Sequence, residues 1–201
     1  MKERFINSSI RFISKYQECD DLKIKKLKYG LEGIYNVLTK LFVVLILAII
    51  TGTIVETSLF LLFYAGIKTF SFGIHAKSSI GCWIITILVY NIIPLAMKNF
   101  NCSNLLGYII IGLSFLSILL WAPADTPKRP LIRRKNRIKC KILSLIIVFL
   151  YATIFLLNNN QAINNAIAYS LMIQSIMINP IIYKITNTRF NNYKYYKNGL
   201  N

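Results

Sequence analysis

The sequence predicts an all-α, polytopic membrane protein with six transmembrane helices, N-terminal amphipathic helices at the membrane surface, and both termini in the cytoplasm. Of its 201 residues, 55% are hydrophobic and only 15% are charged, whereas soluble domains carry about a quarter charged residues. The hydrophobic residues form six runs, each near the length that crosses a bilayer or somewhat shorter. These runs cover residues 41–55, 58–67, 81–97, 105–122, 142–157 and 166–183.

We expect one integral membrane domain over residues 1–201, with a basic leader (1–33), a six-helix bundle (34–183) and a polar tail (184–201). In the leader, apolar residues recur every three or four positions beside lysines, as in helices that lie on an anionic membrane surface. They include Phe5, Ile6, Ile10, Ile13 and Tyr16, and then Ile24, Leu27 and Leu31. An equally good interpretation is that these helices are solvated and pack on the loops.

Lysine and arginine predict the orientation of the chain, because cytoplasmic loops of membrane proteins carry an excess of both. With the N-terminus inside and six spans, every Lys and Arg except Lys98 lies on the cytoplasmic side, including eight in residues 128–141. The stretch 41–67 is short for two crossings. We therefore expect its first helix to begin around Ile34 and a tight turn to follow near Thr53–Thr57.

The composition argues against several classes of site. The four cysteines lie in no CxxC spacing, and a single histidine does not supply a typical zinc site. The sequence has no glycine-rich nucleotide motif, so we expect neither a metal nor another cofactor. The net charge of +17 is explained by the anionic inner leaflet of a membrane, and we expect no nucleic-acid partner.

The stretch FGIHAKSSIGC (72–82) holds the only histidine, His75, and one of the cysteines, Cys82. On one regular helix, side chains seven residues apart would share a face but lie about 10 Å apart along the axis. An imidazole and a thiol do not meet across that distance. The backbone between them must therefore leave the helical path if the two side chains are to act together.

The residues between them favour a loop followed by a helix. Gly73 permits unusual backbone angles, and Ser78 or Ser79 is a good N-cap for a helix that begins near Ile80. We predict that the loop folds back over the first helical turn and brings the imidazole to the thiol of Cys82.

This placement would suit nucleophilic catalysis. A helix N-terminus and a nearby imidazolium favour the thiolate of Cys82, and His75 could act first as a base and then as an acid. Lys68 and Lys77 would add positive potential, and backbone N–H groups of residues 80–82 could receive an oxyanion. The alternative is an interfacial histidine beside a cysteine that only packs.

The motifs GIHAKSSIGC (73–82) and APADTPKRP (122–130) resemble the accessory gene regulator B (AgrB) family, the membrane cysteine endopeptidases of bacterial peptide quorum sensing. The resemblance extends to the size of the chain, its basic leader and its six hydrophobic runs. It implies a location in the bacterial cell membrane and catalytic roles for His75 and Cys82.

The resemblance also implies the substrate and the reaction. The substrate would be a short propeptide of the AgrD type. Cys82 would attack the carbonyl at the C-terminal side of the future signal, His75 would protonate the departing amine, and a thioester would remain. An internal cysteine of the propeptide would then displace Cys82 and release a cyclic thiolactone. A homodimer is compatible with the resemblance.

Two positions depart from the family pattern. The family usually has arginine where Lys68 stands, and often Gly-Gly where Phe72 and Gly73 stand. Lysine keeps the positive charge but lacks the planar fork of arginine, so Lys68 is a supporting candidate by charge alone. Gly73 and Ser78 are supporting candidates because they belong to the first motif.

Further along the chain, Asp125 of the second motif could orient His75. It could instead end a helix in a turn, as a cap or as a partner of Arg129. The basic stretch that follows contains Arg133, Arg134 and Lys135. These three cations could attract an acidic propeptide tail, because substrates of the family tend to carry one.

A function from a different class is that of a non-enzymatic exporter or channel for a small peptide. Such a protein would need polar or charged groups inside several spans, or a nucleotide site. Glu56 is the only acidic residue near a span, and we expect it to be hydrated at a turn. The pairing of His75 with Cys82 therefore favours the endopeptidase.

Overall fold

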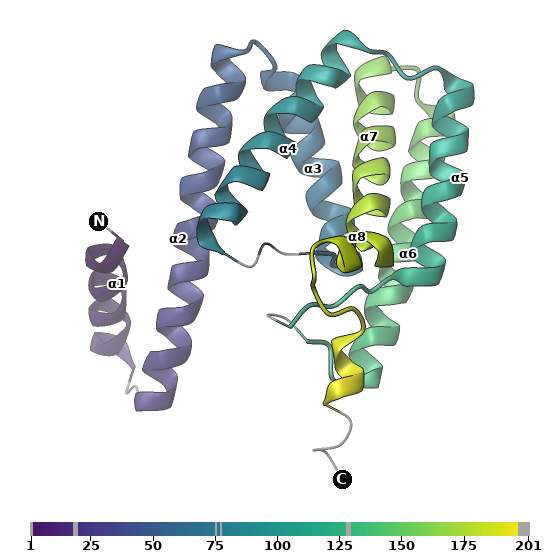
Figure 1. Cartoon of the computed structure of the whole chain (residues 1–201). Helices are drawn as coiled ribbons and strands as arrows, with labels where there is room; N and C mark the ends of the chain where they lie inside the picture. Colours follow the sequence, from purple (N-terminus) through teal and green to yellow (C-terminus); the bar gives the residue numbers. More distant parts are fainter. Residues whose placement is uncertain (1, 18–19, 75, 77, 128–129, 197–201) are drawn as a thin grey trace. The chain divides into compact units, whose positions relative to one another are not determined.

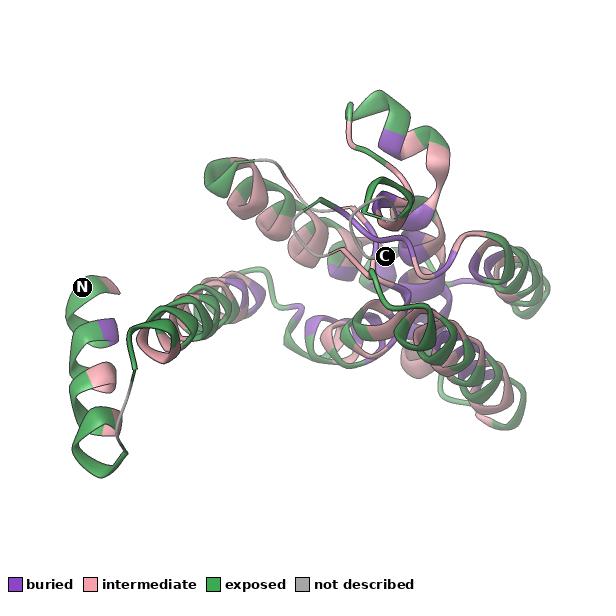
Figure 2. Ribbon diagram, turned by 90° about the horizontal axis from the view of Figure 1, so that it is seen from below, coloured by how far each residue is buried: buried purple, intermediate pink, exposed green. Residues whose placement is uncertain are grey.

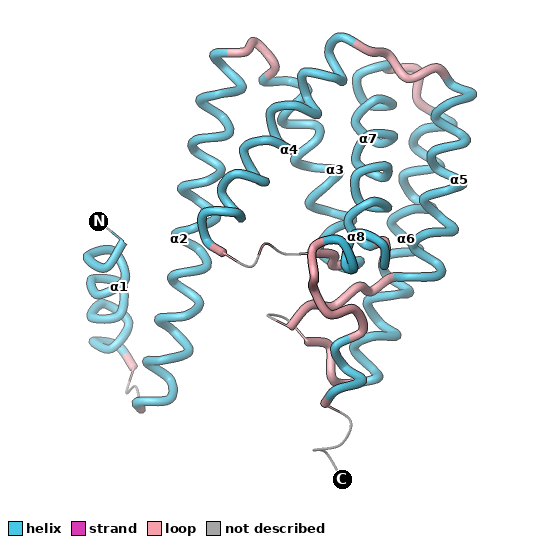
Figure 3. The backbone as a smooth tube through the Cα atoms, viewed as in Figure 1, coloured by secondary structure: helices cyan, strands magenta, loops and turns pink. Residues whose placement is uncertain are grey.

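A computed structural model describes the chain except for residues 1, 18–19, 75, 77, 128–129 and 197–201. The described part contains helices and no named strand (Figures 1 and 3). The helices are α1 (Lys2–Tyr16), α2 (Asp21–Ile50), α3 (Ile54–Ser71), α4 (Ser79–Asn99), α5 (Asn104–Trp121), α6 (Arg134–Leu157), α7 (Gln161–Ile178), α8 (Pro180–Ile185) and a 3₁₀ turn at Asn192–Tyr195. The chain divides into a first unit (residues 1–47) and a second unit (residues 48–201).

In the first unit, α1 packs along the N-terminal half of α2. The side chain of Ile6 is buried, and the rings of Phe5 and Tyr35 lie 5.7 Å apart between centroids. Lys2 also pairs with Glu32 at 3.5 Å. Part of the apolar side of α1, at Phe5 and Ile6, therefore contacts another helix of the leader, whereas Tyr16 is exposed.

The structure differs from the expectation of a second, separate leader helix. Residues 21–50 form one continuous helix of 30 residues, with no break at residues 33–34. The reason is that this stretch contains no proline. Its two glycines, Gly30 and Gly33, have open space around them and impose no bend. The end of the leader and the first hydrophobic run are one element.

The chain has the helices of a multi-pass membrane protein, because five helices in the described part are long and apolar enough to cross a bilayer: α2, α3, α4, α5 and α6. The sixth predicted run (166–183) is divided between α7 and the short helix α8, because α7 ends at Ile178 and Pro180 begins α8. With 18 residues, α7 is not among these five. Asn164, Asn165 and Gln174 make α7 less apolar than its neighbours. All three side chains are buried.

The turn between α2 and α3 lies at residues 51–53, just before the predicted position. Gly52 has a φ of 65°, which favours glycine, and its carbonyl accepts a hydrogen bond of 2.9 Å from the Lys98 ammonium. Glu56 follows in the first turn of α3, where a carboxylate is favoured by the helix dipole. Each helix extends beyond its hydrophobic run, so the short stretch 41–67 accommodates the ends of two helices.

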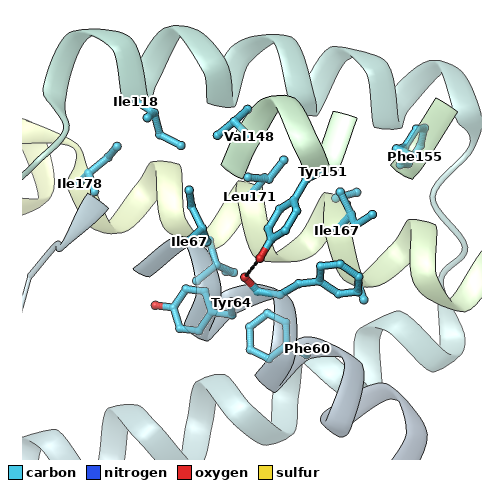
Figure 4. Close-up of a cluster of buried hydrophobic side chains, with 14 of the residues drawn as sticks. Phe60, Tyr64, Ile67, Ile118, Val148, Tyr151, Phe155, Ile167, Leu171 and Ile178 are labelled. Atoms are coloured by element: carbon cyan, nitrogen blue, oxygen red, sulfur yellow. Dashed lines mark hydrogen bonds between the residues drawn. The ribbon is translucent and has the colours of Figure 1, made fainter. Parts of the chain in front are cut away.

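The core of the second unit lies where α3, α5 and α6 pack around α7 (Figures 2 and 4). The side chains of Phe60, Ile67, Ile118 and Leu171 are fully buried. Small residues allow close approach between helices. Gly107, for example, packs directly against the ring of Phe155. The apolar residues outside this core face outward, as expected for helices that are surrounded by lipid.

Polar groups hold α7 at both of its ends. At its start, Asn165 accepts a hydrogen bond from the backbone of Cys102 at 3.0 Å and donates one to the carbonyl of Met97 at 3.1 Å. At its end, Gln174 donates to Ser71 and Phe72, at 2.6 and 2.7 Å. These amides therefore tie α7 to the α4–α5 connection at one level and to the end of α3 at the other.

Candidate active site

The segment that leaves α3 is fixed by backbone hydrogen bonds. The N–H of Gly73 donates to the carbonyl of Ala124 at 2.9 Å, and the N–H of Ala124 donates to the carbonyl of Ser71 at 3.0 Å. The N–H of Ile74 donates to the carbonyl of Met177 at 3.0 Å. Residues 71–74 are thus held between the α5–α6 connection and the end of α7, and these parts meet beside α8 in Figure 1.

Glycine is required at position 73 by this close packing. Gly73 has a φ of 119°, a backbone conformation that L side chains rarely adopt. A Cβ atom there would lie 3.2 Å from the carbonyl oxygen of Met177. The predicted supporting role of Gly73 is therefore a backbone role, since it lets the chain pass between two fixed segments.

Cys82 lies in the first turn of α4. Ser78 is the N-cap, and its side-chain oxygen accepts a hydrogen bond of 3.0 Å from the N–H of Gly81. This cap agrees with the sequence prediction, and α4 begins at Ser79, one residue before the predicted Ile80. The serine side chain thereby satisfies one of the N–H groups that a helix end leaves free.

The predicted oxyanion donors need correction. The N–H of Gly81 is bonded to the Ser78 side chain, and the N–H of Cys82 donates to the Ser78 carbonyl at 3.1 Å. Both donors therefore have partners within the first turn. The cause is the N-cap itself, which positions the serine side chain and carbonyl over these groups.

Cys82 lines a cavity of about 440 Å³ between α3, α4 and α8. Most of the wall is apolar, with a few polar groups that converge on the same space, as in binding sites for small molecules and peptides. The residues that matter for the chemistry are Tyr64, Lys68, Ser78, Cys82, Tyr90 and Thr188.

His75 and Lys77 lie outside the described residues, so the predicted contact between His75 and Cys82 stays a prediction. The residues on either side of His75 are described. Ile74 and Ala76 both line the cavity that contains Cys82. The described residues on either side of the histidine are therefore part of the wall of the cysteine cavity.

Lys68 contributes a positive charge to the same cavity. Its ammonium donates a hydrogen bond of 3.2 Å to the hydroxyl of Tyr64 and lies 4.8 Å from the centroid of that ring. In the described part of the chain, no carboxylate lies within salt-bridge distance of Lys68.

Sequence reasoning missed Tyr64 and Tyr90. Tyr64 precedes Lys68 by four residues, which places the two side chains on one face of α3. That spacing was the available signal for Tyr64. Tyr90 reaches the cavity from α4, and its ring packs edge-on against Tyr64 at 5.8 Å between centroids. Only the packing of α3 on α4 brings these rings together.

Asp125 does not line the cavity. Its carboxylate is buried and accepts hydrogen bonds from three backbone N–H groups, those of Asn192 at 2.8 Å, Leu131 at 3.1 Å and Tyr193 at 3.2 Å. This arrangement resembles the turn that was the alternative interpretation, although Arg129 lies outside the described residues. The observed bonds fix the position of residues 124–125 against the C-terminal segment.

Tyr183 of α8 supports the same connection. Its hydroxyl donates to the carbonyl of Ala124 at 2.8 Å. Burial, together with the nearby charge of Asp125, raises the pKa of this phenol above its usual value. The hydroxyl therefore stays protonated at neutral pH and remains a hydrogen-bond donor. The carbonyl of Ala124 thus accepts hydrogen bonds from both the Tyr183 hydroxyl and the N–H of Gly73.

The three candidate residues for binding an acidic tail lie at the start of α6. Arg133 is the N-cap of this helix, and Arg134 and Lys135 follow. All three side chains are exposed, and none lines the cavity of Cys82. The structure thus leaves them accessible at a separate surface. Among the described residues, no cluster of histidine, cysteine and acidic side chains could hold a metal ion.

Comparison with known proteins assigns the chain to a family. The family model of accessory gene regulator B matches residues 6–178. A putative AgrB-like protein of Listeria monocytogenes is 32% identical over 86% of this chain and 84% of its own length. The accessory gene regulator protein B of Staphylococcus epidermidis is 31% identical over 90% of this chain and 92% of its own.

A putative AgrB-like protein of Clostridium acetobutylicum is 29% identical over 90% of this chain and 87% of its own length. No solved structure matches the chain. Because the family model covers most of the sequence and the relatives align over nearly their whole length, this chain belongs to the accessory gene regulator B (AgrB) family.

Proposed function

We propose that this chain is a membrane cysteine endopeptidase that cleaves the C-terminal tail from a short propeptide of the AgrD type and releases a cyclic thiolactone. Membership of the AgrB family gives the chain a role in accessory gene regulator quorum sensing. The observation that carries the finer proposal is the position of Cys82. Its thiol lies in the first helical turn of α4, in a largely apolar cavity that also holds the Lys68 ammonium.

In the first step, the thiolate of Cys82 attacks the scissile carbonyl carbon and forms a C–S bond. The peptide C–N bond then breaks, and His75 gives a proton to the departing amine. The acidic tail leaves, and the signal portion remains on Cys82 as a thioester. His75 suits this role because it is the only histidine of the chain and its sequence neighbours line the cavity.

In the second step, the thiol of an internal cysteine of the propeptide attacks the thioester carbonyl. A new thioester closes the ring, and the sulfur of Cys82 leaves and recovers a proton. One thioester replaces another, so the exchange needs no external energy source. Water would compete for the same carbonyl, and the apolar wall of the cavity disfavours its entry.

Lys68 serves this mechanism by electrostatics. A positive charge beside the sulfur favours the thiolate, and it also stabilises the negative oxygen that forms when the carbonyl is attacked. The N–H groups of Gly81 and Cys82 are already hydrogen-bonded within the helix. The ammonium of Lys68 therefore contributes more of the stabilisation of the negative oxygen. Tyr64 holds the ammonium in place through its hydroxyl and its ring.

We further infer that α7 is the sixth span and that both termini lie in the cytoplasm. The start of α7 is bonded to the α4–α5 connection, and its end is bonded to the segment after α3. The helix therefore extends from one end of the bundle to the other, as the neighbouring spans do. Its buried amides find partners inside the bundle, which is how polar groups are tolerated within a membrane.

Replacing either catalytic residue tests the central proposal. We expect Cys82→Ser and His75→Ala to lower cleavage of a co-expressed AgrD-type propeptide by at least about 10³-fold, because each removes a group that takes part in bond breaking. Cleavage is measured by mass spectrometry of the peptide products, and insertion by the amount of protein in the membrane fraction. Cys140→Ser is the matched control and should retain activity. A fully active Cys82→Ser variant would end the proposal.

Changes at Lys68 and Tyr64 test the electrostatic role. In a variant whose only cysteine is Cys82, we expect Lys68→Gln to slow alkylation of the thiol at neutral pH several-fold, and Tyr64→Phe to slow it less. Lys68→Arg should preserve the rate because it keeps the charge. Tyr151→Phe is the control, since its hydroxyl bonds to the Phe63 carbonyl away from the cavity. Equal rates for Lys68→Gln and the parent would contradict this role.

Charge reversal tests the proposed tail site. The triple change Arg133→Glu, Arg134→Glu and Lys135→Glu should reduce cleavage of a propeptide with an acidic tail at least tenfold, with less effect at high salt, since salt screens exposed charges. Insertion should change less than cleavage. A propeptide whose acidic tail residues are replaced by glutamine is the control. If the triple variant slows both peptides equally, these cations do not bind the tail.

Labelling of single cysteines tests the topology. With a reagent that does not cross the membrane, Phe100→Cys and Asn159→Cys should react in intact cells. Lys139→Cys and Lys194→Cys should react only after the membrane is permeabilised. Reaction at Asn159 and Lys194 from the same side would show that α7 does not cross.

A further inference from the structure

A second cavity, of about 260 Å³, lies where α5 ends, α6 begins and the C-terminal segment crosses between them. Its wall contains Trp121, Arg137, Lys141, Phe190 and Tyr193. It shares no lining residue with the cavity of Cys82. Neither the proposed peptidase chemistry nor the proposed tail site uses it.

The two cations of this cavity are arranged to receive one anion. Arg137 and Lys141 lie one turn apart on α6, so both side chains point to the same side of the helix. Both are half-buried, whereas Arg133, Arg134 and Lys135 are exposed. The shared cavity is what distinguishes Arg137 and Lys141 from the rest of the basic stretch.

Arg137 is held in place without a carboxylate. Its guanidinium lies 3.4 Å from the centroid of the Tyr193 ring. In the part of the chain that the structure describes, no acidic side chain lies within salt-bridge distance of Arg137 or Lys141. The carboxylate of Asp125, which is near Tyr193 in the fold, accepts backbone N–H groups on both of its oxygens. The two cations are therefore available to an external anion.

Two apolar residues of the remaining wall are exposed on the outside of the bundle. Leu120 is 67% exposed and Ile138 is 49% exposed, and both lie on helices that are candidate spans. Trp121 ends α5, and tryptophan is enriched where a span reaches the headgroup region of a membrane. A ligand that contacts both the two cations and the exposed apolar residues needs a negatively charged head and an apolar body. Such a molecule would enter the cavity from the membrane.

We propose that this cavity binds one anionic phospholipid, with its phosphate between Arg137 and Lys141 and its acyl chains against Leu120 and Ile138. The guanidinium offers two parallel N–H donors to phosphate oxygens, and the ammonium adds a point charge. Basic pockets between spans on the cytoplasmic side of a membrane suit such headgroups. An acidic peptide would satisfy the cations but would leave the exposed apolar residues without a partner.

The position of the lipid gives it a structural consequence. The ring of Tyr193 stacks against the Arg137 guanidinium, and its backbone N–H donates to the Asp125 carboxylate. The neighbouring residue, Ala124, accepts a hydrogen bond from the N–H of Gly73. A lipid at Arg137 would therefore stabilise the same C-terminal segment that positions the loop before Cys82. Binding itself can be measured without any peptide substrate, so its outcome is independent of the proposed peptidase reaction.

The test is native mass spectrometry of the full chain in detergent, titrated with phosphatidylglycerol. The parent should retain one phosphatidylglycerol, and the double variant Arg137→Gln/Lys141→Gln should need at least tenfold more lipid for the same bound fraction. Each single variant should need a lipid concentration between those of the parent and the double variant. The control Lys139→Gln/Lys184→Gln removes the same number of charges from exposed positions and should bind like the parent. Equal binding by the double variant and the parent would overturn the proposal.

Competition identifies the ligand. Phosphatidylcholine, inorganic phosphate and a soluble glutamate-rich peptide should each fail to displace phosphatidylglycerol from the parent at matched concentrations. Displacement by inorganic phosphate would assign the cavity to free phosphate, and displacement by the peptide would assign it to an acidic segment. Either result would overturn the lipid assignment. Retention of the parent's helical circular dichroism by the double variant shows that any loss of binding is local.

Discussion

The short segment between Ser71 and Ile74 is the constraint on which the candidate site depends. It passes between the α5–α6 connection and the end of α7, and backbone hydrogen bonds to Ala124 and Met177 fix it on both sides. Gln174 adds two further bonds from inside the bundle. Because these partners belong to the rigid packing of α3, α5 and α7, the loop that carries the histidine begins from a fixed point, and the first turn of α4 follows a few residues later.

The second sequence motif acts on the first through this same contact. Asp125 looks like a third member of a catalytic arrangement when only the sequence is considered. Its carboxylate accepts hydrogen bonds from the backbone of residues 131, 192 and 193, and its predicted contact with His75 stays a prediction because that residue lies outside the described part. Those bonds set the place of Ala124, which receives the N–H of Gly73 and donates to Ser71. A buried carboxylate that does not line the cavity can thus support the site, because it positions the backbone on which the site is built.

Local chemistry explains what could be predicted from the sequence. The cap at Ser78 and the position of Cys82 in a first helical turn depend on a few adjacent residues, and both were predicted. The extent of α2, the additional polar character of α7 and the pairing of Tyr64 with Tyr90 depend on contacts between distant segments. Hydropathy marked residues 166–183 as the sixth run, but the partners of the buried amides Asn165 and Gln174 come from distant segments that only the folded bundle brings together. His75 and its contact with the thiol remain a prediction, since that residue lies outside the described part.

On the proposed function, the distribution of charge separates the reaction from membrane anchoring. Among the described residues that line the cavity of Cys82, the one lysine is Lys68, and its ammonium contacts an aromatic ring and a hydroxyl instead of a carboxylate. A carboxylate there would cancel the potential that a thiolate and an oxyanion require. Eight Lys and Arg residues lie in residues 128–141, around the start of α6, and none of those that the structure describes lines this cavity. On the proposed function, they can meet lipid or an acidic tail without lowering the reactivity of the sulfur. A membrane enzyme that exchanges one thioester for another needs both conditions, since it must hold a charged substrate at the surface while its reacting carbonyl lies in an apolar space.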